Sequence, residues 1–537
     1  MIRSNGPIKA DAHGDLNGDG VPCLMASFYG TGDQEYAESD MKPNIILMVW
    51  DATRAKNLPF YGYHRNTTPF LKSIERDLSV YRNAISSSYW TLPSITSIFT
   101  GMHSSSHGLL VDGDTINPSL FLLSEILGHE GYSCGAFNRN PYVSSFSGLD
   151  KGFHEYVSDA RCLWDYLKQV ERRWKKRFST DPSQVFSVQD TQVSPDGDTT
   201  VKRRMIERLK HVPDAFTDSG SRRMARLFSK WVREKTKENK PIFAFFQTIE
   251  THSPYRTPLR FSLKYLTPAE IYQKICINQD HLSFLLGKTR MTESDFSILR
   301  NAYDNAILYS DSLTGLLIQT LKDEKIYENT LFILLADHGE SIGEHDLMFH
   351  IWSLYDNLIK VPLVIKYPKD LGMTGQVEAI VQNTDILPTI LTLLGKPNHP
   401  AAAQLQGNSL VDGSIVNRDP DIAISELIKP FGPDKMAYRS QLSKYDRRLL
   451  SVRNAHQKFI YSSRGDHEFY DLAKDPEEMS NLYDESTVFT NLDTRAKIFY
   501  QRMEDFYQQN RAHIEMEKMP QIEDESIKEQ LRQLGYL

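Results

Sequence analysis

Residues 45–51 read Ile45-Ile46-Leu47-Met48-Val49-Trp50-Asp51, an unbroken apolar run that ends in a carboxylate. A second run, Leu331-Phe332-Ile333-Leu334-Leu335-Ala336, ends in Asp337-His338. Apolar runs without alternation are typical of strands that are buried on both faces, as in a parallel sheet covered by helices. The two stretches therefore predict two inner strands, each with polar side chains at its carboxyl end.

The same pattern extends over the middle of the chain. Residues 242–246 and 361–365 are further apolar runs, and residues 296–321 carry apolar side chains at a spacing near 3.6. Strands that alternate with helices indicate an α/β fold. We expect a central, mostly parallel sheet flanked by helices, with a smaller C-terminal α+β subdomain.

Composition divides the chain into three parts. Residues 1–40 are polar and rich in Gly and Asp, which predicts a flexible leader. Its stretch 15–20 resembles half of a calcium loop, but Ala26 stands where such a loop needs Glu, so a solvated turn is the preferred interpretation. Residues 41–400 are expected to form the catalytic domain, and residues 401–537 the C-terminal subdomain.

Two of these parts have predicted internal features. A charged segment at about 155–240 predicts an insertion of exposed helices around a loop. Within the C-terminal part, residues 449–461 and 467–472 predict strands, and residues 494–509 and 526–534 predict helices.

The overall composition excludes several classes of protein. The 537 residues include 40% hydrophobic and 11% aromatic residues, enough for a sizeable core, and a net charge of −7 argues against a nucleic-acid binder. The four cysteines lack paired spacing and are expected to be free thiols: Cys23, Cys134, Cys162 and Cys276. No apolar stretch predicts a signal peptide or transmembrane helix, so a cytoplasmic location is expected.

The strand ends carry the predicted chemistry. In open α/β sheets, ligands bind beyond the carboxyl ends of the strands. A lone Asp after a strand is usually a turn or cap residue, but Asp51 and the Asp337-His338 pair occur in one chain. Carboxylates and an imidazole are ligands for divalent cations, and the imidazole suits manganese, zinc or iron. We therefore expect a metal site built from these three residues.

A third element supplies a hydroxyl group. Pro93 is suited to the first turn of a helix that runs through Ile95 and Phe99 and ends near Gly101. Thr91 then lies just before the N-terminus of this helix, where the helix dipole favours an anion. Thr91 is either an N-cap residue or a nucleophile that attacks a phosphoryl or sulfuryl centre.

These elements belong to a longer series of motifs in a fixed order. The series comprises residues 43–51 with Arg54, 61–63, 67–71, 90–94 with 99–101 and 107–108, 251–255, 336–340 with 343–345 and His350, 361–363, 384–389, 469–472 with 475–478 and 481–482, and 533–537. The ordered set resembles the sulfatase branch of the alkaline phosphatase superfamily, over roughly residues 43–400 and again near the C-terminus.

This resemblance implies roles for further residues. His252 looks like the substrate histidine of the family, with a loop histidine as the alternative. His350 is similar to the anion-binding residue after the second metal motif, with a helix-start or core histidine as the alternative. Arg54 is expected either to contact substrate or to pair with a carboxylate. Glu344 and His345 are expected beside the metal ligands, His107 and Asp311 are expected to be structural, and Asp112 lies near a substrate-binding position of some relatives.

Departures from the family pattern restrict the chemistry. Sulfatases carry Cys or Ser in a C/S-x-P-x-R motif, and this Cys or Ser is oxidised to formylglycine, which threonine cannot form. Thr91 instead resembles the nucleophile of the superfamily's phosphodiesterases, phosphonate hydrolases and transferases. Ala52 stands where sulfatases usually have a second Asp, and the extra Asp-x-x-x-His set of two-zinc phosphatases is not found near His252. We therefore expect one divalent ion, with manganese favoured over calcium, magnesium or zinc.

The resulting hypothesis is a metal-dependent hydrolase that uses a covalent threonine intermediate. Its substrates are phosphate diesters, phosphate monoesters, phosphonates or sulfate esters, carried by a small molecule, glycan or lipid. The alternatives are a sulfuric ester hydrolase without formylglycine, a phospho-alcohol headgroup transferase, and a catalytically silent binding protein. The oligomeric state stays open.

Overall fold

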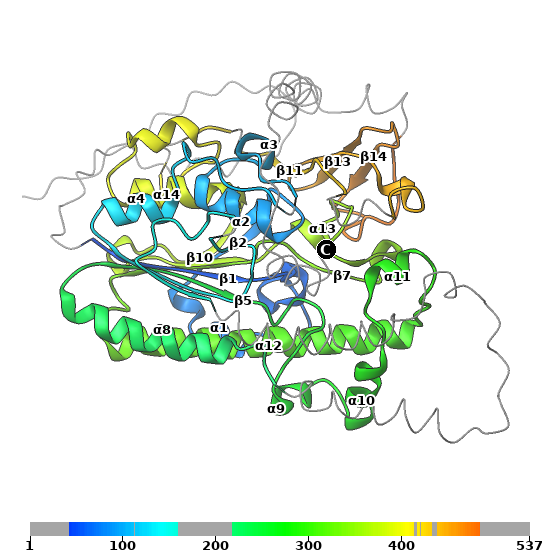
Figure 1. Ribbon diagram of the computed structural model, residues 1–537, viewed down its shortest axis with the longest axis horizontal. Helices are drawn as coiled ribbons and strands as arrows, with labels where there is room; N and C mark the ends of the chain where they lie inside the picture. Colours follow the sequence, from blue (N-terminus) through cyan, green and yellow to red (C-terminus); the bar gives the residue numbers. More distant parts are fainter. Residues whose placement is uncertain are drawn as a thin grey trace, which may run out of the picture. The chain divides into compact units, whose positions relative to one another are not determined.

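The computed structural model describes residues 42–111, 113–145, 147–158, 217–412, 416–418, 420–431 and 438–483 (Figure 1). Several predictions lie outside these described residues. They are the leader at 1–40 with its 15–20 turn, Asp112, residues 159–216 of the charged insertion, the helices at 494–509 and 526–534, the motif at 533–537, and the thiols of Cys23 and Cys162. Cys134 and Cys276 are free, as expected.

The two apolar runs that open the sequence argument form neighbouring strands at the centre of the main sheet. Its eight strands have the order β10-β2-β9-β6-β1-β5-β3-β4. Their bounds are β1 (Asn44–Trp50), β2 (Ser79–Ile85), β3 (Ser133–Asn138), β4 (Glu155–Ser158), β5 (Ile242–Thr248), β6 (Thr330–Leu335), β9 (Leu363–Lys366) and β10 (Gly375–Gln382). This is the predicted α/β sheet.

One strand departs from the parallel arrangement. All neighbouring pairs in this sheet are parallel except those made by β9, which runs antiparallel to both β2 and β6. The apolar run at 361–365 therefore marks a buried strand, as predicted, but its direction is opposite to that of the other three runs. Burial on both faces is the same for either direction, so the apolar pattern does not encode strand direction.

Helices cover both faces of the sheet (Figure 1). Ile45, Leu47 and Val49 of β1 pack into one apolar cluster with α2, α4 and α14, whereas Ile46, Met48 and Trp50 pack into another with α8 and α12. The helix bounds are α1 (Pro69–Ser73), α2 (Thr91–Thr100), α3 (Ser104–His107), α4 (Leu123–His129), α8 (Ser221–Lys235), α9 (Leu259–Ser262), α10 (Pro268–Cys276), α11 (His281–Leu285), α12 (Glu293–Asp323), α13 (Asp356–Ile359) and α14 (Ile386–Leu393). None of the helices described here combines the length and apolar character that a membrane crossing needs.

Both described flanks of the charged insertion pack on the main sheet, and the α8 flank buries an apolar stripe, which differs from the expectation of exposed helices. β4 pairs with β3 at the sheet edge, and α8 buries Met224, Phe228 and Trp231 against the sheet. A Cβ atom on Gly135 of β3 would lie 2.7 Å from the Trp231 ring, so this glycine makes room for the indole. The many basic residues of α8 conceal this apolar stripe in the sequence.

The C-terminal part forms a separate antiparallel sheet of four strands. They are β11 (Ala423–Leu427), β12 (Leu449–Arg453), β13 (Gln457–Ser462) and β14 (Glu468–Asp471). Earlier in the chain, β7 (Ser341–Ile342) and β8 (Met348–Phe349) form a separate two-stranded ribbon. The predicted strand at 449–461 is two strands, because the chain turns at Asn454, whose Oδ1 accepts the backbone N–H groups of His456 and Gln457. Leu449, Ile460 and Tyr470 join the apolar cluster that contains Ile45.

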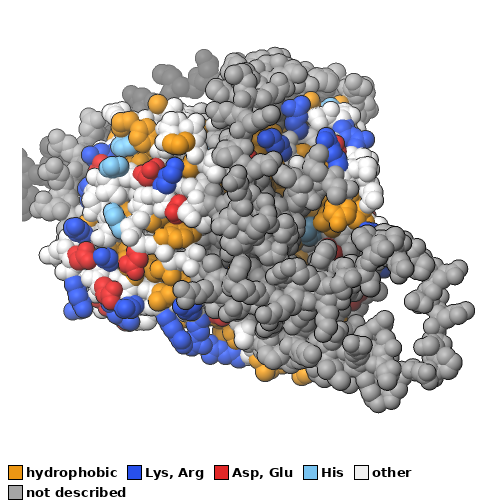
Figure 2. Space-filling model, viewed as in Figure 1, with side chains coloured by type: hydrophobic (Ala, Val, Ile, Leu, Met, Phe, Trp, Pro, Cys, Tyr) orange, Lys and Arg blue, Asp and Glu red, His pale blue; other side chains and the backbone are white. Residues whose placement is uncertain are grey.

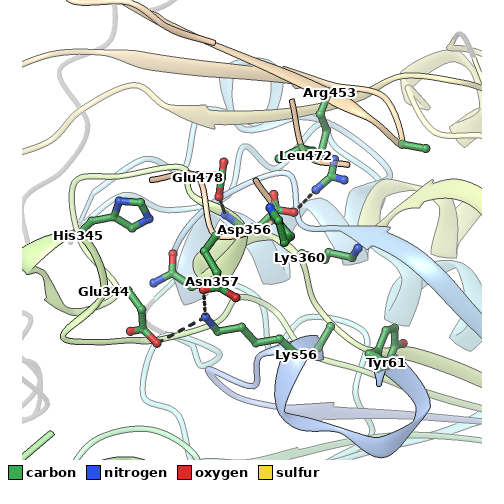
Figure 3. A pocket seen from close by; sticks show the side chains of 14 residues that line it. Lys56, Tyr61, Glu344, His345, Asp356, Asn357, Lys360, Arg453, Leu472 and Glu478 are labelled. Atoms are coloured by element: carbon green, nitrogen blue, oxygen red, sulfur yellow. Dashed lines mark hydrogen bonds and ion pairs between the residues drawn. The ribbon is translucent and has the colours of Figure 1, made fainter. Parts of the chain in front are cut away.

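A cavity of about 290 Å³ lies between α13 and the C-terminal sheet (Figure 3). Its charged lining residues pair with one another. Lys56 Nζ lies 2.7 Å from Glu477 Oε2 and 3.5 Å from Glu344 Oε1, and Asp356 pairs with Arg453. On the molecular face in Figure 2, cationic and anionic side chains are interspersed over the left part of the coloured area, and cationic side chains gather along its lower edge.

Candidate active site and metal centre

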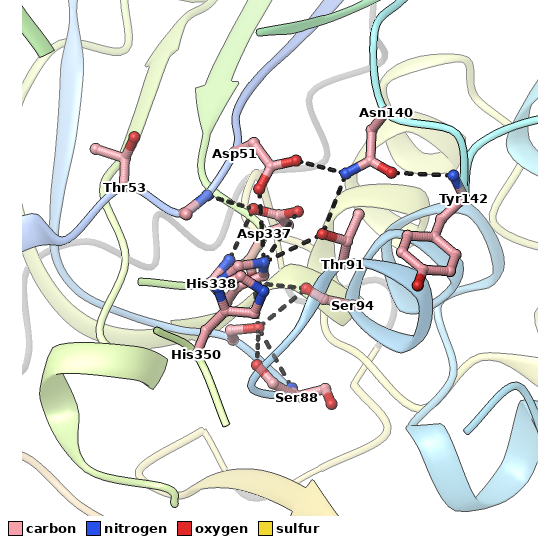
Figure 4. A network of polar contacts seen from close by, with 12 residues as sticks. Asp51, Thr53, Ser88, Thr91, Ser94, Asn140, Tyr142, Asp337, His338 and His350 are labelled. Atoms are coloured by element: carbon pink, nitrogen blue, oxygen red, sulfur yellow. Dashed lines mark hydrogen bonds and ion pairs between the residues drawn. The ribbon is translucent and has the colours of Figure 1, made fainter. Parts of the chain in front are cut away.

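Sheet topology brings the predicted metal ligands together. β1 and β6 are parallel neighbours with Val49 opposite Leu335, so the residues that follow them meet at one edge of the sheet. Asp51 follows β1, and Asp337 and His338 follow β6 (Figure 4). One oxygen of each carboxylate and one imidazole nitrogen all lie within 4.8 Å of one another. All three side chains are fully buried.

The atoms that point into this cluster have the chemistry of a cation site. Asp51 Oδ1 and Asp337 Oδ2 are buried and accept no hydrogen bond from the residues that the structure describes, although each lies 3.6 Å from His338 Nε2. Buried carboxylate oxygens normally have a hydrogen-bond donor or a cation beside them. Burial, together with the charge of Asp337, raises the pKa of Asp51 well above its ordinary value. The two carboxylates therefore fit a divalent cation placed between them.

Neighbouring groups fix the orientation of these ligands. His338 Nδ1 lies 2.8 Å from the Gly339 carbonyl and donates to it, which leaves the Nε2 lone pair facing the carboxylates. Burial lowers the pKa of His338, which favours the neutral imidazole that metals bind. Asp337 Oδ1 accepts the backbone N–H groups of Ala52 and His338, at 3.1 and 2.9 Å. Asp337 Oδ2 is therefore the oxygen of this carboxylate that remains available to a cation.

Close packing of the backbone holds the second metal motif. Gly339 N donates to Leu358 O at 2.7 Å, and a Cβ atom on Gly339 would lie 2.0 Å from Asn357 O. Only a glycine permits this approach of the segment after His338 to α13. The close packing of the candidate metal motif against α13 thus depends on one residue without a side chain.

Thr91 points into the same cluster. It is the first residue of α2, whose N-cap is Trp90, and Trp90 makes no side-chain cap. Thr91 Oγ1 lies 3.2 Å from His338 Nε2 and 3.3 Å from Asn140 Nδ2. The helix begins one residue earlier than predicted, and the N-cap alternative for Thr91 does not describe its position.

Two residues that the sequence analysis did not identify complete the cluster. Asn140 Nδ2 donates to Asp51 Oδ2 at 2.7 Å, and Gln247 Nε2 donates to the same oxygen at 3.0 Å. Both side chains are buried. Gln247 is a polar residue inside the buried strand β5, and such a residue is a signal in the sequence; Asn140 lies in a loop after β3, a strand that the apolar pattern did not reveal.

The two predicted histidines lie beside the metal cluster. The ring centres of His350 and His338 are 4.2 Å apart, and those of His252 and His350 are 4.9 Å apart. His350 Nδ1 lies 3.1 Å from Glu340 Oε1, and His252 Nδ1 lies 2.8 Å from the Ser253 carbonyl. Burial lowers the pKa of His252 to about 4, so this ring is neutral at pH 7.

Arg54 pairs with a carboxylate, which was one of its two predicted roles. Its Nη1 lies 2.7 Å from Glu344 Oε1 and 3.4 Å from Glu340 O, and its guanidinium stacks over the Tyr303 ring. Burial alone would raise the pKa of Glu344, but the charge of Arg54 lowers it to about 2. Arg54 thus holds the segment after the metal ligands in place.

The remaining predicted residues have structural contacts. Asp311 accepts the N–H groups of Phe70 and Leu71 at the start of α1, and His107 Nε2 lies 3.2 Å from Ser97 Oγ and 3.1 Å from Pro93 O. His345 stacks on Tyr355, with ring centres 3.7 Å apart. Asp311 and His107 agree with the structural roles expected of them.

The similarity to known proteins extends over most of the chain. The sequence profile described as Sulfatase matches residues 43–396, and that of the N-sulphoglucosamine sulphohydrolase C-terminal region matches residues 343–507. The chain belongs to the sulfatase family. This confirms the predicted superfamily, its fold and the class of ester hydrolases, and members of this superfamily depend on a metal ion.

Individual relatives of this sulfatase-family chain are distant. It is similar to an ulvan-active sulfatase of Formosa agariphila, with 22% identity over 83% of this chain and 78% of that protein. It is also similar to the multifunctional alkaline phosphatase superfamily protein PehA of Trinickia caryophylli, with 23% identity over 82% of this chain and 91% of that protein. The phosphonate monoester hydrolase of Agrobacterium radiobacter has the same fold, with a TM-score of 0.62, 20% identity, and coverage of 87% of this chain and 96% of that one.

Proposed function

We propose that the chain is a divalent-metal-dependent hydrolase of phosphate, phosphonate or sulfate esters with Thr91 as its nucleophile. The observation that carries the proposal is the position of Thr91 Oγ1, 3.2 Å from His338 Nε2 and beside two carboxylate oxygens that accept no hydrogen bond. Asp51, Asp337 and His338 would hold the ion, and Thr91 Oγ1 would be its fourth protein contact. When bound, such an ion lowers the pKa of a coordinated hydroxyl and neutralises charge on the ester oxygens.

The residues of the chain then perform two substitutions at one centre. Thr91 Oγ attacks the phosphorus or sulfur in line, the bond to the ester oxygen breaks, and the departing alcohol receives a proton. A water molecule attacks the resulting threonine ester, which restores the Thr91 hydroxyl and releases phosphate, phosphonate or sulfate, or a phosphate monoester where the substrate is a diester. An alcohol in place of this water would make the enzyme a transferase.

The surroundings of Thr91 support charge development on the transferred group. The N-terminal end of α2 favours an anion, and we assign His252 and His350 to the equatorial oxygens as hydrogen-bond donors. His252 Nδ1 lies 2.8 Å from the Ser253 carbonyl and donates to it, so Nε2 donates to a substrate oxygen only when the ring takes up a second proton. Because Arg54 already pairs with Glu344, the proposal gives it a role in holding that segment rather than in touching substrate.

A phosphorus ester is the preferred substrate because threonine cannot provide the aldehyde hydrate that formylglycine sulfatases use. The family name and the sulfatase relatives support a sulfate ester as the second candidate. We propose manganese as the ion, because the mixed carboxylate and imidazole ligands suit it. Glycan or lipid esters and simple small-molecule esters are all within this proposal.

The test is an activity panel with a matched nucleophile control. The purified protein would be assayed on p-nitrophenyl phosphate, bis-p-nitrophenyl phosphate, p-nitrophenyl phenylphosphonate and p-nitrophenyl sulfate with Mn²⁺, Mg²⁺, Ca²⁺ or Zn²⁺. Thr91→Ala is expected to lower kcat at least about 1,000-fold on the best substrate while Mn²⁺ binding persists, because the nucleophile is lost but three ligands remain. Turnover by Thr91→Ala at the wild-type rate would refute the assignment.

A further inference from the structure

Asn140 makes two contacts at the centre of the candidate active site (Figure 4). Its Nδ2 lies 2.7 Å from Asp51 Oδ2 and 3.3 Å from Thr91 Oγ1. An amide nitrogen carries two hydrogens, so one can serve each oxygen. This side chain therefore ties a metal ligand from β1 to the nucleophile of α2.

The orientation of the Asn140 amide is determined by its neighbours. Its Oδ1 accepts the backbone N–H of Tyr142 at 3.0 Å. The reversed amide would place Oδ1 against the Asp51 carboxylate and Nδ2 against the Tyr142 N–H, which leaves an acceptor facing an acceptor and a donor facing a donor. Only the donating orientation toward Asp51 and Thr91 satisfies all three contacts.

The backbone of Asn140 is held as firmly as its side chain. Asn138, the last residue of β3, accepts the Asn140 N–H through Oδ1 at 2.7 Å and donates through Nδ2 to the Asn140 carbonyl at 2.7 Å. Both asparagines are buried, with 0% and 2% of their surface exposed. A donor held by a strand end in this way restricts the directions available to the groups that it contacts.

We infer that Asn140 is a positioning residue that sets the direction of Thr91 Oγ relative to the Asp51 carboxylate. This inference rests on the proposed function, and it assigns to Asn140 the alignment of the Thr91 nucleophile for in-line attack. A threonine on the first turn of a helix has more than one χ1 rotamer available. The Asn140 bond selects the rotamer that points toward His338 and the cation site, whereas Gln247 contacts Asp51 alone.

The first experiment separates hydrogen-bond donation from side-chain shape. Asn140→Asp keeps the size and the contact with Tyr142 N but cannot donate to Thr91. It is expected to lower kcat about 100-fold with KM within about threefold of wild type, because a misdirected nucleophile slows the chemical step rather than binding. Mn²⁺ binding, measured by calorimetry on the full chain, is expected to be undiminished, because the new carboxylate lies beside the ligand Asp51.

Two companion variants isolate the Thr91 contact. Gln247→Ala removes a donor to Asp51 but none to Thr91, so it is expected to weaken Mn²⁺ binding about 10-fold and to lower kcat much less than Asn140→Ala does. Asn305→Asp changes a buried asparagine that donates to Ser262 O away from the site, and it is expected to retain kcat. Equal kcat losses in Gln247→Ala and Asn140→Ala would overturn the inference, and so would wild-type kcat in Asn140→Asp.

A structural measurement does not depend on turnover. In crystals grown with Mn²⁺, Thr91 of the wild type is expected to occupy one χ1 rotamer, and Thr91 of Asn140→Ala is expected to occupy more than one. A single unchanged rotamer in Asn140→Ala would contradict the inference while leaving the proposed function intact. Failure of the proposed function has a different signature, namely full activity of Thr91→Ala.

Discussion

At the scale of single residues, the site places two carboxyl groups close together in a buried position. Asp51 Oδ1 and Asp337 Oδ2 are buried without hydrogen-bond donors, and burial together with the charge of Asp337 raises the pKa of Asp51. In the absence of a cation, the two carboxylates therefore repel each other in a medium of low dielectric constant. The proposed catalytic arrangement therefore lowers the stability of the metal-free protein.

Asp337→Asn tests this cost directly. The amide oxygen can still accept the Ala52 and His338 N–H groups, but one charge is removed. In EDTA, the variant is expected to unfold at a temperature about 2–4 °C above wild type, which corresponds to roughly 1 kcal/mol in a domain of moderate size. With Mn²⁺, the wild type should be stabilised and the variant much less so, measured by differential scanning fluorimetry.

A second buried aspartate provides the control for this prediction. Asp311 accepts two backbone N–H groups at the start of α1 and faces no carboxylate in the metal cluster. Asp311→Asn is therefore expected to lower the unfolding temperature with and without Mn²⁺. A lower unfolding temperature for Asp337→Asn in EDTA would contradict the view that the metal-free site is strained by charge.

The site residues that sequence predicted are those that follow recognisable elements. Asp51, Asp337 and His338 follow apolar strands, so their proximity follows from sheet geometry, and Thr91 begins a helix marked by Pro93. Asn140 was not predicted because β3, with the sequence Ser-Cys-Gly-Ala-Phe-Asn, contains small residues that make space for Trp231 rather than an apolar run.

At the scale of elements, one buried carboxylate joins α3 to the strand β11 of the C-terminal sheet. Glu426 Oε2 accepts Ser105 N at 2.8 Å, and its Oε1 lies 2.8 Å from Ser105 Oγ. No cation is among the groups that shift its pKa, and burial raises that pKa to about 7. The carboxyl group is therefore protonated in the folded protein over a pH range where it is ionised in the unfolded chain.

This difference predicts a pH dependence of stability with a defined sign. Between pH 4.5 and about 7 the folded state holds a proton that the unfolded state releases, so the free energy of unfolding falls as the pH rises through this window. Glu426→Gln, which cannot ionise, is expected to gain roughly 2–3 kcal/mol relative to wild type between pH 4.5 and 7.5. Urea unfolding of both proteins at the two pH values measures it, and parallel pH profiles would refute it.

Helices and strands with a clear apolar pattern were predicted from the sequence, and features without such a pattern were not. β1, β5, β6 and α12 follow from uninterrupted runs or from helical periodicity, and these four hold the centre of the fold. The direction of β9 and the division of 449–461 into β12 and β13 depend on pairing and on a turn, which a hydrophobic pattern does not encode. The stripe of α8 was hidden among its basic residues.

At the scale of the whole molecule, a buried ionic cluster links the C-terminal sheet to the catalytic sheet. Lys458 Nζ lies 2.9 Å from Asp356 Oδ1 and 2.7 Å from Glu478 Oε1, and Arg453 also pairs with Asp356. Burial alone would raise the pKa of Asp356, but the charges of Arg453 and Lys458 hold it well below its usual range. Asp356 begins α13, whose carbonyls accept the Gly339 and Glu340 N–H groups.

Lys458→Met removes the central cation of this cluster. The buried carboxylates of Asp356 and Glu478 then lose a neutralising positive charge, so the variant is expected to lose about 3 kcal/mol of unfolding free energy in urea. Because α13 is then displaced, the variant is also expected to bind Mn²⁺ more weakly. Lys56→Met is the control, since the Lys56 side chain is 36% exposed and its pair with Glu477 is expected to contribute less than about 1 kcal/mol. Equal effects of the two variants would contradict the prediction.

The neighbouring positions of β1 and β6 have a consequence for biosynthesis. Asp51 and His338, two of the three proposed metal ligands, come from distant parts of the polypeptide and meet only when strands from both parts have paired. A ribosome must therefore translate nearly 300 codons after the first ligand before the nascent protein can capture its ion. Under the proposed function, loading with a divalent cation is thus a late event, and ion uptake by newly made protein would report that both halves of the sheet have joined.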